Sequence, residues 1–123
     1  MGSVITLAEC KRYAVISEYE TVYLIDKTAN TKIIIGDFYG DPNGAIIDPN
    51  EKFVVMYGCG IIVYFLVPPF KEYTYNTKTA QWFEIGRNED IMWIQKVLQI
   101  SDKKIKAVLE NGQTEIISVE IPD

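Results

Sequence analysis

Residues 35–66 read IGDFYGDPNGAIIDPNEKFVVMYGCGIIVYFL, and this stretch decides the fold. Two runs near its end, 52–57 and 61–67, are nearly continuous in apolar residues, which indicates strands buried on both faces. The Gly-Cys-Gly sequence at 58–60 lies between them and favours a tight hairpin that needs positive φ. The preceding segment, 36–44, holds three glycines and one proline and is predicted to be a loop. We therefore expect a β protein built around one central hairpin.

The rest of the chain is predicted to form further strands separated by polar turns. Residues 111–112, Asn-Gly, are the strongest short hairpin signal and predict a type I′ turn. Residues 91–100 fit neither the helical nor the strand period, but their β-branched content and Trp93 favour a strand; a helix near 88–99 is the alternative. The other expected strands are 4–7, 12–18, 21–26, 32–35, 45–48, 73–76, 80–85, 104–110 and 113–121.

Three of these hairpins resemble one another and begin at Tyr13, Phe53 and Ile105. The first two starts are 40 residues apart, which is the length of a propeller blade, but three blades do not close a propeller. We therefore expect meander hairpins stacked into one or two sheets. The predicted fold is one all-β domain over residues 1–123, a mainly antiparallel twisted sheet forming a sandwich or half-open barrel with at most one short helix.

Charge and composition exclude several classes of function. The chain has 12 Lys and Arg against 17 Asp and Glu, a net charge of −5, which argues against direct binding of nucleic acid or anionic membranes and suits a basic partner. It has no histidine, so Ser-His-Asp and Cys-His catalysis and His-ligated zinc are excluded. Without a secretory signal pattern, Cys10 and Cys59 are expected to be reduced thiols in a cytoplasmic protein.

Carboxylates gather in the central loop, where Asp37, Asp41, Asn43 and Asp48 invite comparison with a calcium site. Their spacing does not match an EF-hand loop, and Asp and Asn in a Gly-rich loop mostly form turns. A glycosidase pair, Asp37 with Asp41 or Glu89 with Asp90, is disfavoured because so small a domain shows no sign of a deep cleft. We expect no catalytic residue, no metal and no cofactor, and hence no enzyme.

Aromatic residues divide into a predicted core set and a loop set. The core set is Tyr13, Tyr23, Phe53, Tyr64, Phe65, Phe83 and Trp93. The set in or beside loops is Phe38, Tyr39, Tyr73, Tyr75 and Trp82. Tyr and Trp beside carboxylates are typical of protein–protein surfaces, because aromatic rings supply desolvated area and acids supply steering. Covering the ends of the sheet is the equally weighted alternative for these loop aromatics.

The stretch 36–64, followed by PPFKEY, resembles small all-β bacterial proteins encoded beside polymorphic toxins, notably the immunity proteins of contact-dependent growth inhibition systems. The resembling block is about a quarter of the chain. It implies a non-catalytic cytoplasmic antidote that binds one cognate toxin domain, often a basic nuclease, and blocks its active site or substrate groove. Interfaces in such proteins vary with the toxin, so the resemblance carries no binding residue over to this chain.

The charge argument supplies the expected partner-binding residues instead. Carboxylates would mimic phosphates in the RNA groove of a toxin nuclease, and Tyr39 and Trp82 would anchor the patch. The expected set is Asp37, Tyr39, Asp41, Asp48, Trp82, Glu84, Glu89 and Asp90. The alternative function is a non-catalytic β scaffold that binds a small ligand or forms a homodimer through its flat sheet.

Overall fold

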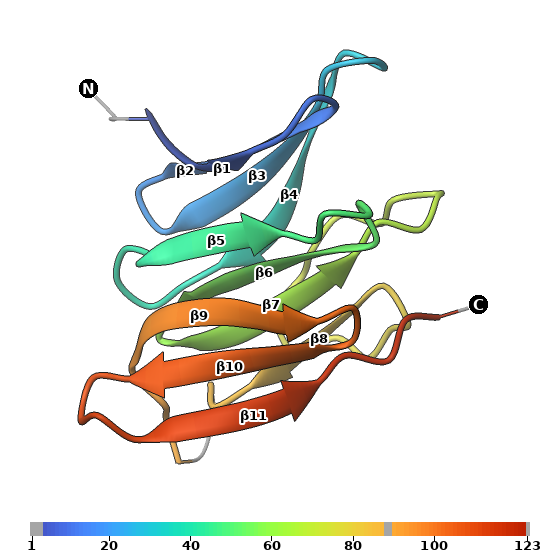
Figure 1. Ribbon diagram of the computed structural model, residues 1–123. Helices are drawn as coiled ribbons and strands as arrows, with labels where there is room; N and C mark the ends of the chain where they lie inside the picture. Colours follow the sequence, from blue (N-terminus) through green and yellow to red (C-terminus); the bar gives the residue numbers. More distant parts are fainter. Residues whose placement is uncertain (1–3, 88–89, 123) are drawn as a thin grey trace.

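The computed structural model describes residues 4–87 and 90–122. Within these residues the regular secondary structure consists of β-strands alone, with no helix (Figure 1). The strands are β1 (Val4–Glu9), β2 (Tyr13–Glu18), β3 (Thr21–Asp26), β4 (Thr31–Asp37), β5 (Gly44–Ile47), β6 (Phe53–Gly58), β7 (Gly60–Phe65), β8 (Trp82–Ile85), β9 (Ile94–Ser101), β10 (Lys104–Leu109) and β11 (Thr114–Ser118). The described part of the chain therefore has no helix long and apolar enough to cross a membrane.

The strands form three antiparallel sheets, each a meander of consecutive strands. Sheet A has the order β1-β2-β3-β4, sheet B the order β5-β6-β7-β8, and sheet C the order β9-β10-β11. Figure 1 shows the three sheets stacked with sheet B between the other two. The predicted all-β antiparallel sandwich is confirmed, with three sheets in place of the one or two expected, and none of them closes into a barrel.

Sheet B lies in the middle because its two central strands are apolar on both faces. Val54, Met56, Ile62 and Tyr64 face the core shared with sheet A, and Phe53, Val55, Ile61 and Val63 face the core shared with sheet C. All eight residues are 0% exposed. The continuous apolar runs of the sequence thus arise from alternation between two cores, as expected for a strand covered on both faces.

Three local predictions were wrong. The segment 73–76 is not a strand: Tyr73 donates one backbone hydrogen bond to the Ile34 carbonyl at 2.8 Å, and Asn76 then turns the chain with φ of 57°. The turn at 110–113 is not type I′, because Gly112 has positive φ (91°) and Asn111 does not. The Gly112 amide instead bonds the Leu109 carbonyl at 2.9 Å, the pattern of a three-residue loop that ends in a glycine bulge. Of the two glycines of the central hairpin, only Gly60 has positive φ.

The ambiguous segment 91–100 is resolved as a strand, since β9 begins at Ile94. Trp93, which the sequence assigned to the core, is 47% exposed at the start of this strand. Its backbone forms a bridge with Cys59, so its position is fixed by sheet B while its side chain points outward. The predicted edge strand at the N-terminal side is confirmed as β1, the outermost strand of sheet A.

Candidate functional site

Alternate connections of the three meanders converge at one end of the molecule, on the left in Figure 1. In an antiparallel meander every second turn lies at the same end, so the β2–β3, β4–β5, β6–β7, β8–β9 and β10–β11 connections meet there. We name this region the loop-end surface. It comprises Tyr19, Glu20, residues 37–43, Cys59, Tyr75, Arg87, residues 90–93, Glu110 and Asn111.

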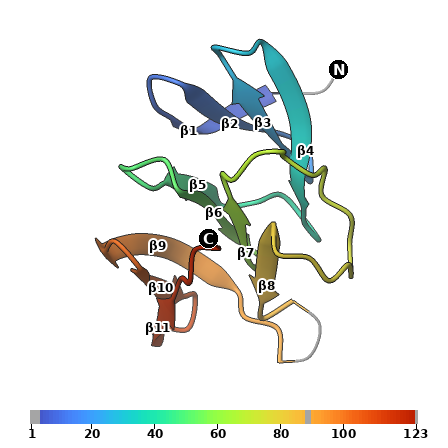
Figure 2. The same cartoon turned by 90° about the vertical axis from the view of Figure 1, so that its right-hand side faces the viewer.

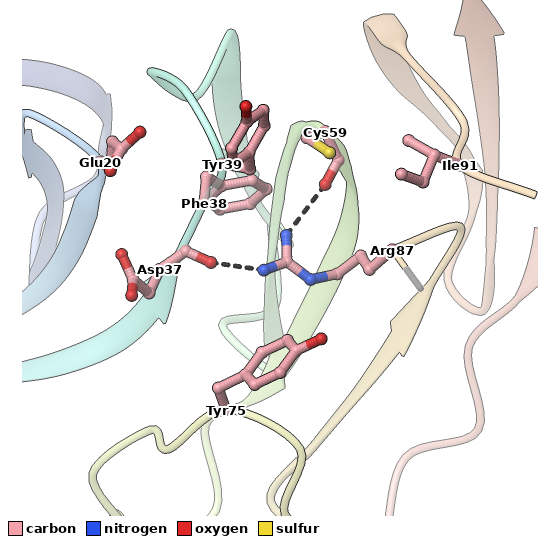
Figure 3. Close-up of a pocket in the computed structure, with 8 residues that line it drawn as sticks. All are labelled: Glu20, Asp37, Phe38, Tyr39, Cys59, Tyr75, Arg87 and Ile91. Carbon is pink, nitrogen blue, oxygen red and sulfur yellow. Dashed lines mark hydrogen bonds between the residues drawn. The ribbon is translucent and has the colours of Figure 1, made fainter. Parts of the chain in front are cut away.

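A half-open cavity of about 450 Å³ lies at the centre of the loop-end surface (Figure 3). It is lined by Glu20, Asp37, Phe38, Tyr39, Cys59, Tyr75, Arg87 and Ile91. Asp37 ends β4, and the other lining residues come from the β2–β3, β4–β5, β6–β7 and β8–β9 connections and from the long β7–β8 connection, which supplies Tyr75. A smaller hollow of about 190 Å³ adjoins it, because Ile91 lines both, and Trp93, Leu109, Glu110 and Asn111 complete the second.

Arg87 connects two of the elements that line the cavity. Its guanidinium donates hydrogen bonds from Nη1 to the Cys59 carbonyl at 2.9 Å and from Nη2 to the Asp37 carbonyl at 2.5 Å (Figure 3). Its Cζ also lies 4.6 Å from the centroid of the Phe38 ring, within the range of a cation–π contact. Arg87 therefore ties the end of β4 to the tip of the β6–β7 hairpin.

The charge of Arg87 is neutralised inside the protein by Glu84. Arg87 Nε lies 2.6 Å from Glu84 Oε1, although its N–H is not directed at that oxygen, so the contact is an ion pair rather than a hydrogen bond. The same oxygen accepts a hydrogen bond from the Tyr73 hydroxyl at 2.8 Å. Burial, followed by the contact with Glu84, raises the pKa of Tyr73 well above its usual value of 10. Because only 7% of the Arg87 side chain is exposed, little of its positive charge reaches solvent.

Exposed apolar side chains are concentrated at the loop-end surface. Of the ten large apolar side chains exposed in the described part of the chain, five lie here: Tyr19, Tyr39, Tyr75, Ile91 and Trp93. Tyr39 is the most exposed of them, at 80%. Aromatic residues at the centre of a surface are typical anchors of protein–protein interfaces. The concentration at one end distinguishes this surface from scattered exposed apolar residues, which are normal.

Carboxylates surround these apolar side chains. Glu20, Asp37, Asp41, Asp90 and Glu110 are all exposed, while Arg87 is the one cation among the described residues of this surface. Glu20 also orders the loop, because its Oε2 accepts a hydrogen bond from the Gly40 amide at 2.6 Å. Since Arg87 is already paired with Glu84, the surface as a whole presents negative charge.

The structure places three of the eight sequence-predicted partner residues together on this surface, with a fourth beside them. Asp37 is exposed at the end of β4, Tyr39 and Asp41 are exposed on the β4–β5 connection, and Asp90 is exposed on the β8–β9 connection. Glu84 lies behind them as the ion-pair partner of Arg87. Glu89 lies outside the described residues.

Asp48 and Trp82 are corrections to the prediction, because both are buried. Asp48 is 2% exposed and lies at the opposite end of β5, where its Oδ2 accepts the Lys52 amide at 3.1 Å and its Oδ1 accepts Gln99 Nε2 at 2.7 Å. Trp82 is 3% exposed and stacks on Tyr64, with ring centroids 6.1 Å apart. Neither side chain has surface to offer a partner in this conformation.

Sequence reasoning missed Tyr19, Glu20, Ile91, Trp93 and Glu110. A signal for most of them was present, since each lies in or beside a turn that alternates along a meander with the turn at 37–43. Phe38 and Tyr73 were placed among the loop aromatics, but both are buried, at 3% and 5% exposure.

The oxygen ligands considered for calcium do not converge. Asp48 lies at the far end of β5 from Asp41, and the side-chain amide of Asn43 donates to the Ile94 carbonyl at 2.6 Å. Within residues 4–87 and 90–122 there is no cluster of three or more acidic or cysteine side chains that could hold a metal ion. Cys59 is buried at the hairpin tip, and both cysteines are free thiols.

No protein-family model matches the sequence, and no curated protein is significantly similar to it. The surface described above is therefore interpreted from its own chemistry.

Proposed function

We propose that this protein binds a basic protein domain through the loop-end surface, and that it serves as an immunity protein that neutralises a cognate bacterial toxin. The observation that carries the proposal is the coincidence of exposed Tyr39, Tyr75 and Trp93 with five exposed carboxylates on the loop-end surface. Aromatic side chains supply desolvated contact area, and the surrounding carboxylates steer a basic partner. The toxin class, a nuclease, comes from the resemblance in residues 36–64 and from this charge.

The mechanism proposed is occlusion. Asp37, Asp41 and Asp90 take the places of phosphates and pair with Lys and Arg in the RNA groove of the toxin, while Tyr39 enters the groove as an anchor. The loops are suited to this because Glu20 and Arg87 already order the β4–β5 connection before binding. A stable complex of this kind buries on the order of 1,600 Å² in total. The inhibitor then needs no catalytic step of its own.

The experiment is co-expression with the toxin domain encoded beside this gene, followed by purification of the complex and measurement of its affinity. Asp37→Lys with Asp41→Lys should weaken binding by at least about tenfold, which corresponds to about 1.4 kcal/mol. Tyr39→Ala should weaken it by a similar factor through a faster dissociation rate. Added salt should slow association of the unmodified protein, because it screens long-range steering.

The matched control is Asp102→Lys with Glu120→Lys. It changes the net charge by the same amount at exposed residues outside the loop-end surface. If this pair weakens binding as much as the pair at Asp37 and Asp41, the effect is one of net charge and the loop-end surface is not the interface. If cells die although the protein is soluble, the immunity function is wrong, and ligand binding or homodimerisation is left as the function.

A second candidate function is binding of a small apolar ligand, favoured by the cavity of about 450 Å³, a volume typical of ligand pockets. Its apolar lining comes from Phe38, Tyr39, Tyr75 and Ile91. The neutral dye Nile red tests it. Fluorescence enhancement that Ile91→Asp abolishes would favour a ligand site, whereas no enhancement leaves the protein-binding function.

A further inference from the structure

The two outer sheets each turn one face away from the rest of the molecule, and both of these faces carry apolar side chains. In sheet C the register places Leu98, Lys106 and Ile116 in one row across β9, β10 and β11. Leu98 and Ile116 are 41% and 56% exposed, and neither belongs to a core cluster. Val108 lies on the same face, since it pairs with Thr114 and Lys96.

Sheet A has a similar outward face. The register places Thr6, Ile16 and Tyr23 in one row, with Ala14 and Ile25 in the next. None of these side chains belongs to either core cluster, although their neighbours Tyr13, Val15 and Leu24, one step along each strand, all do. The outward residues of β2 and β3 are therefore as apolar as the inward ones. Ala14 and Ile16 are nevertheless buried, at 7% and 8% exposure, whereas Val4 at the edge of this face is 58% exposed. A sheet of this kind normally has both faces covered.

The three sheets are also arranged as part of a ring. The first strands of the sheets lie together, because β1 contacts β5 and β5 contacts β9. From this line the sheets spread apart toward β4, β8 and β11 (Figure 2). Sequential meanders that radiate from their first strands are the arrangement of propeller blades, which close in rings of four to eight. An open stack of repeated units leaves its two end faces bare unless polar residues cap them.

The two end faces differ in charge. The face of sheet C carries Lys96, Lys104 and Lys106, which form no ion pair among the residues that the structure describes. The face of sheet A carries Glu9 and Glu18; Glu9 is already ion-paired with Lys27, and Lys32 lies over the Tyr23 ring. Two copies of the sheet C face would place lysines against lysines, which is unfavourable. Sheet A against sheet C avoids this repulsion and places Glu18 opposite the lysines of sheet C.

We propose that two copies of this chain associate with sheet A of each packed on sheet C of the other, giving a closed ring of six sheets. A two-fold axis generates two identical junctions, so the assembly closes and leaves no end face bare. The total area that a stable interface requires, on the order of 1,600 Å², is then shared between two junctions. The loop-end surfaces of both copies stay exposed on one side of the ring, so this assembly is independent of the function proposed above.

The experiment is sedimentation velocity with light scattering over a wide range of protein concentration. The 14.0 kDa chain should sediment as a discrete species of twice that mass. Leu98→Glu with Ile116→Glu places two carboxylates on the exposed face of sheet C and should weaken the dimer at least about tenfold. Val4→Lys with Thr6→Lys should do the same from sheet A, because it places two cations opposite the lysines of sheet C. The control, Tyr39→Glu with Ile91→Glu at the loop-end surface, should remain a dimer, and circular dichroism should show that all variants keep their strands.

Mixing the two interface variants tests the pairing itself. Each is expected to be a monomer alone, but together they form a heterodimer through the one junction in which neither face is altered. A monomer for the unmodified chain at every concentration would overturn the proposal. So would a mass that keeps growing beyond two copies, which indicates an open filament, or dimerisation of the sheet A variant by itself, which indicates a junction between two sheet C faces.

Discussion

At the scale of single residues, Arg87 determines how the loop-end surface is held. Its guanidinium donates hydrogen bonds to the carbonyl oxygens of Asp37 at the end of β4 and Cys59 in the β6–β7 turn, and it pairs with the carboxylate of Glu84 in β8; its side chain is 7% exposed. Arg87→Met should lower the free energy of unfolding by about 3 kcal/mol, because it leaves Glu84 without its partner in a partly buried site. Arg87→Lys keeps the charge but cannot reach both carbonyls at once, so it should recover less than half of the loss. Urea unfolding measures both, and full stability in Arg87→Lys would show that the two hydrogen bonds of Arg87 to the Asp37 and Cys59 carbonyls contribute nothing to stability.

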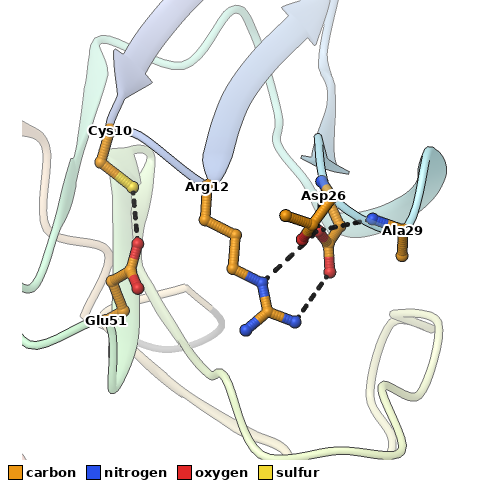
Figure 4. A network of polar contacts seen from close by, with 6 residues as sticks. Cys10, Arg12, Asp26, Ala29 and Glu51 are labelled. Atoms are coloured by element: carbon orange, nitrogen blue, oxygen red, sulfur yellow. Dashed lines mark hydrogen bonds and ion pairs between the residues drawn. The ribbon is translucent and has the colours of Figure 1, made fainter.

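Asp26 is the residue whose titration should be visible in stability. The hydroxyl of Thr28 donates to its Oδ1 at 2.6 Å, and Arg12 pairs with its Oδ2 at 3.2 Å (Figure 4). The Thr28 hydrogen bond first, and then Arg12 against the opposing effect of burial, lower the pKa of Asp26 from 3.8 to about 2. Because the folded pKa is the lower one, Asp26 stabilises the fold above pH 4, and this contribution is lost as the pH falls toward 2.

Asp26→Asn removes that contribution. In urea unfolding, the variant should be less stable than the unmodified protein by a constant margin from pH 7 down to about pH 4. The margin should then shrink between pH 4 and pH 2, where Asp26 becomes protonated. If the difference in unfolding free energy stayed constant between pH 4 and pH 2, the destabilisation by Asp26→Asn would come from altered packing and not from the lost charge.

At the scale of elements, the β6–β7 hairpin depends on Gly60. Gly60 has φ of 81°, and an added Cβ would lie 2.8 Å from the carbonyl oxygens of both Ile85 and Gly86 and would meet the Arg87 side chain. Gly112 is a matched control, because it has φ of 91° with open space around it. Gly112→Ala should cost about 1 kcal/mol for the left-handed conformation alone. Gly60→Ala should cost at least twice as much in urea unfolding, and equal losses would show that the packing around Gly60 is loose.

Strands were the part of the fold most accessible from sequence. Alternation and β-branched content located the hairpins around Tyr19, Gly58 and Asn111, because these signals depend on neighbours in the chain. The type I′ prediction failed at Asn111 because loop length, not the Asn-Gly pair alone, selects the turn. The number of sheets was underestimated because consecutive strands do not pair at two places, between β4 and β5 and between β8 and β9, and no local pattern distinguishes these connections from hairpin turns.

At the scale of the whole molecule, the candidate site was only half predictable. The central loop supplied Asp37, Tyr39 and Asp41, since turn chemistry at 36–44 predicts exposure. Trp82 could not be placed, because its burial depends on stacking against Tyr64, 18 residues earlier, and Tyr73. The exposure of Ile91 and Trp93 could not be predicted either, because it depends on how the segment before β9 packs against sheet B. Because the site is built from five connections, it forms only when the three sheets are packed together, and no single segment of the sequence indicates it.

The layered architecture also predicts how the molecule opens. Exposing the amides of β6 and β7 requires sheet B to separate from both cores, because adjacent residues such as Val54 and Val55 lie in different ones. Hydrogen exchange should therefore be slowest in β6 and β7 and approach the global unfolding limit there. Exchange should be much faster in β1, an edge strand whose Val4 and Ile5 are more than half exposed. Val63→Ala, which leaves a cavity in only one core, should still accelerate exchange of β6 amides on both faces. If it accelerated exchange in sheet C alone, the three layers would be opening as independent units and the two cores would not be coupled through the central hairpin.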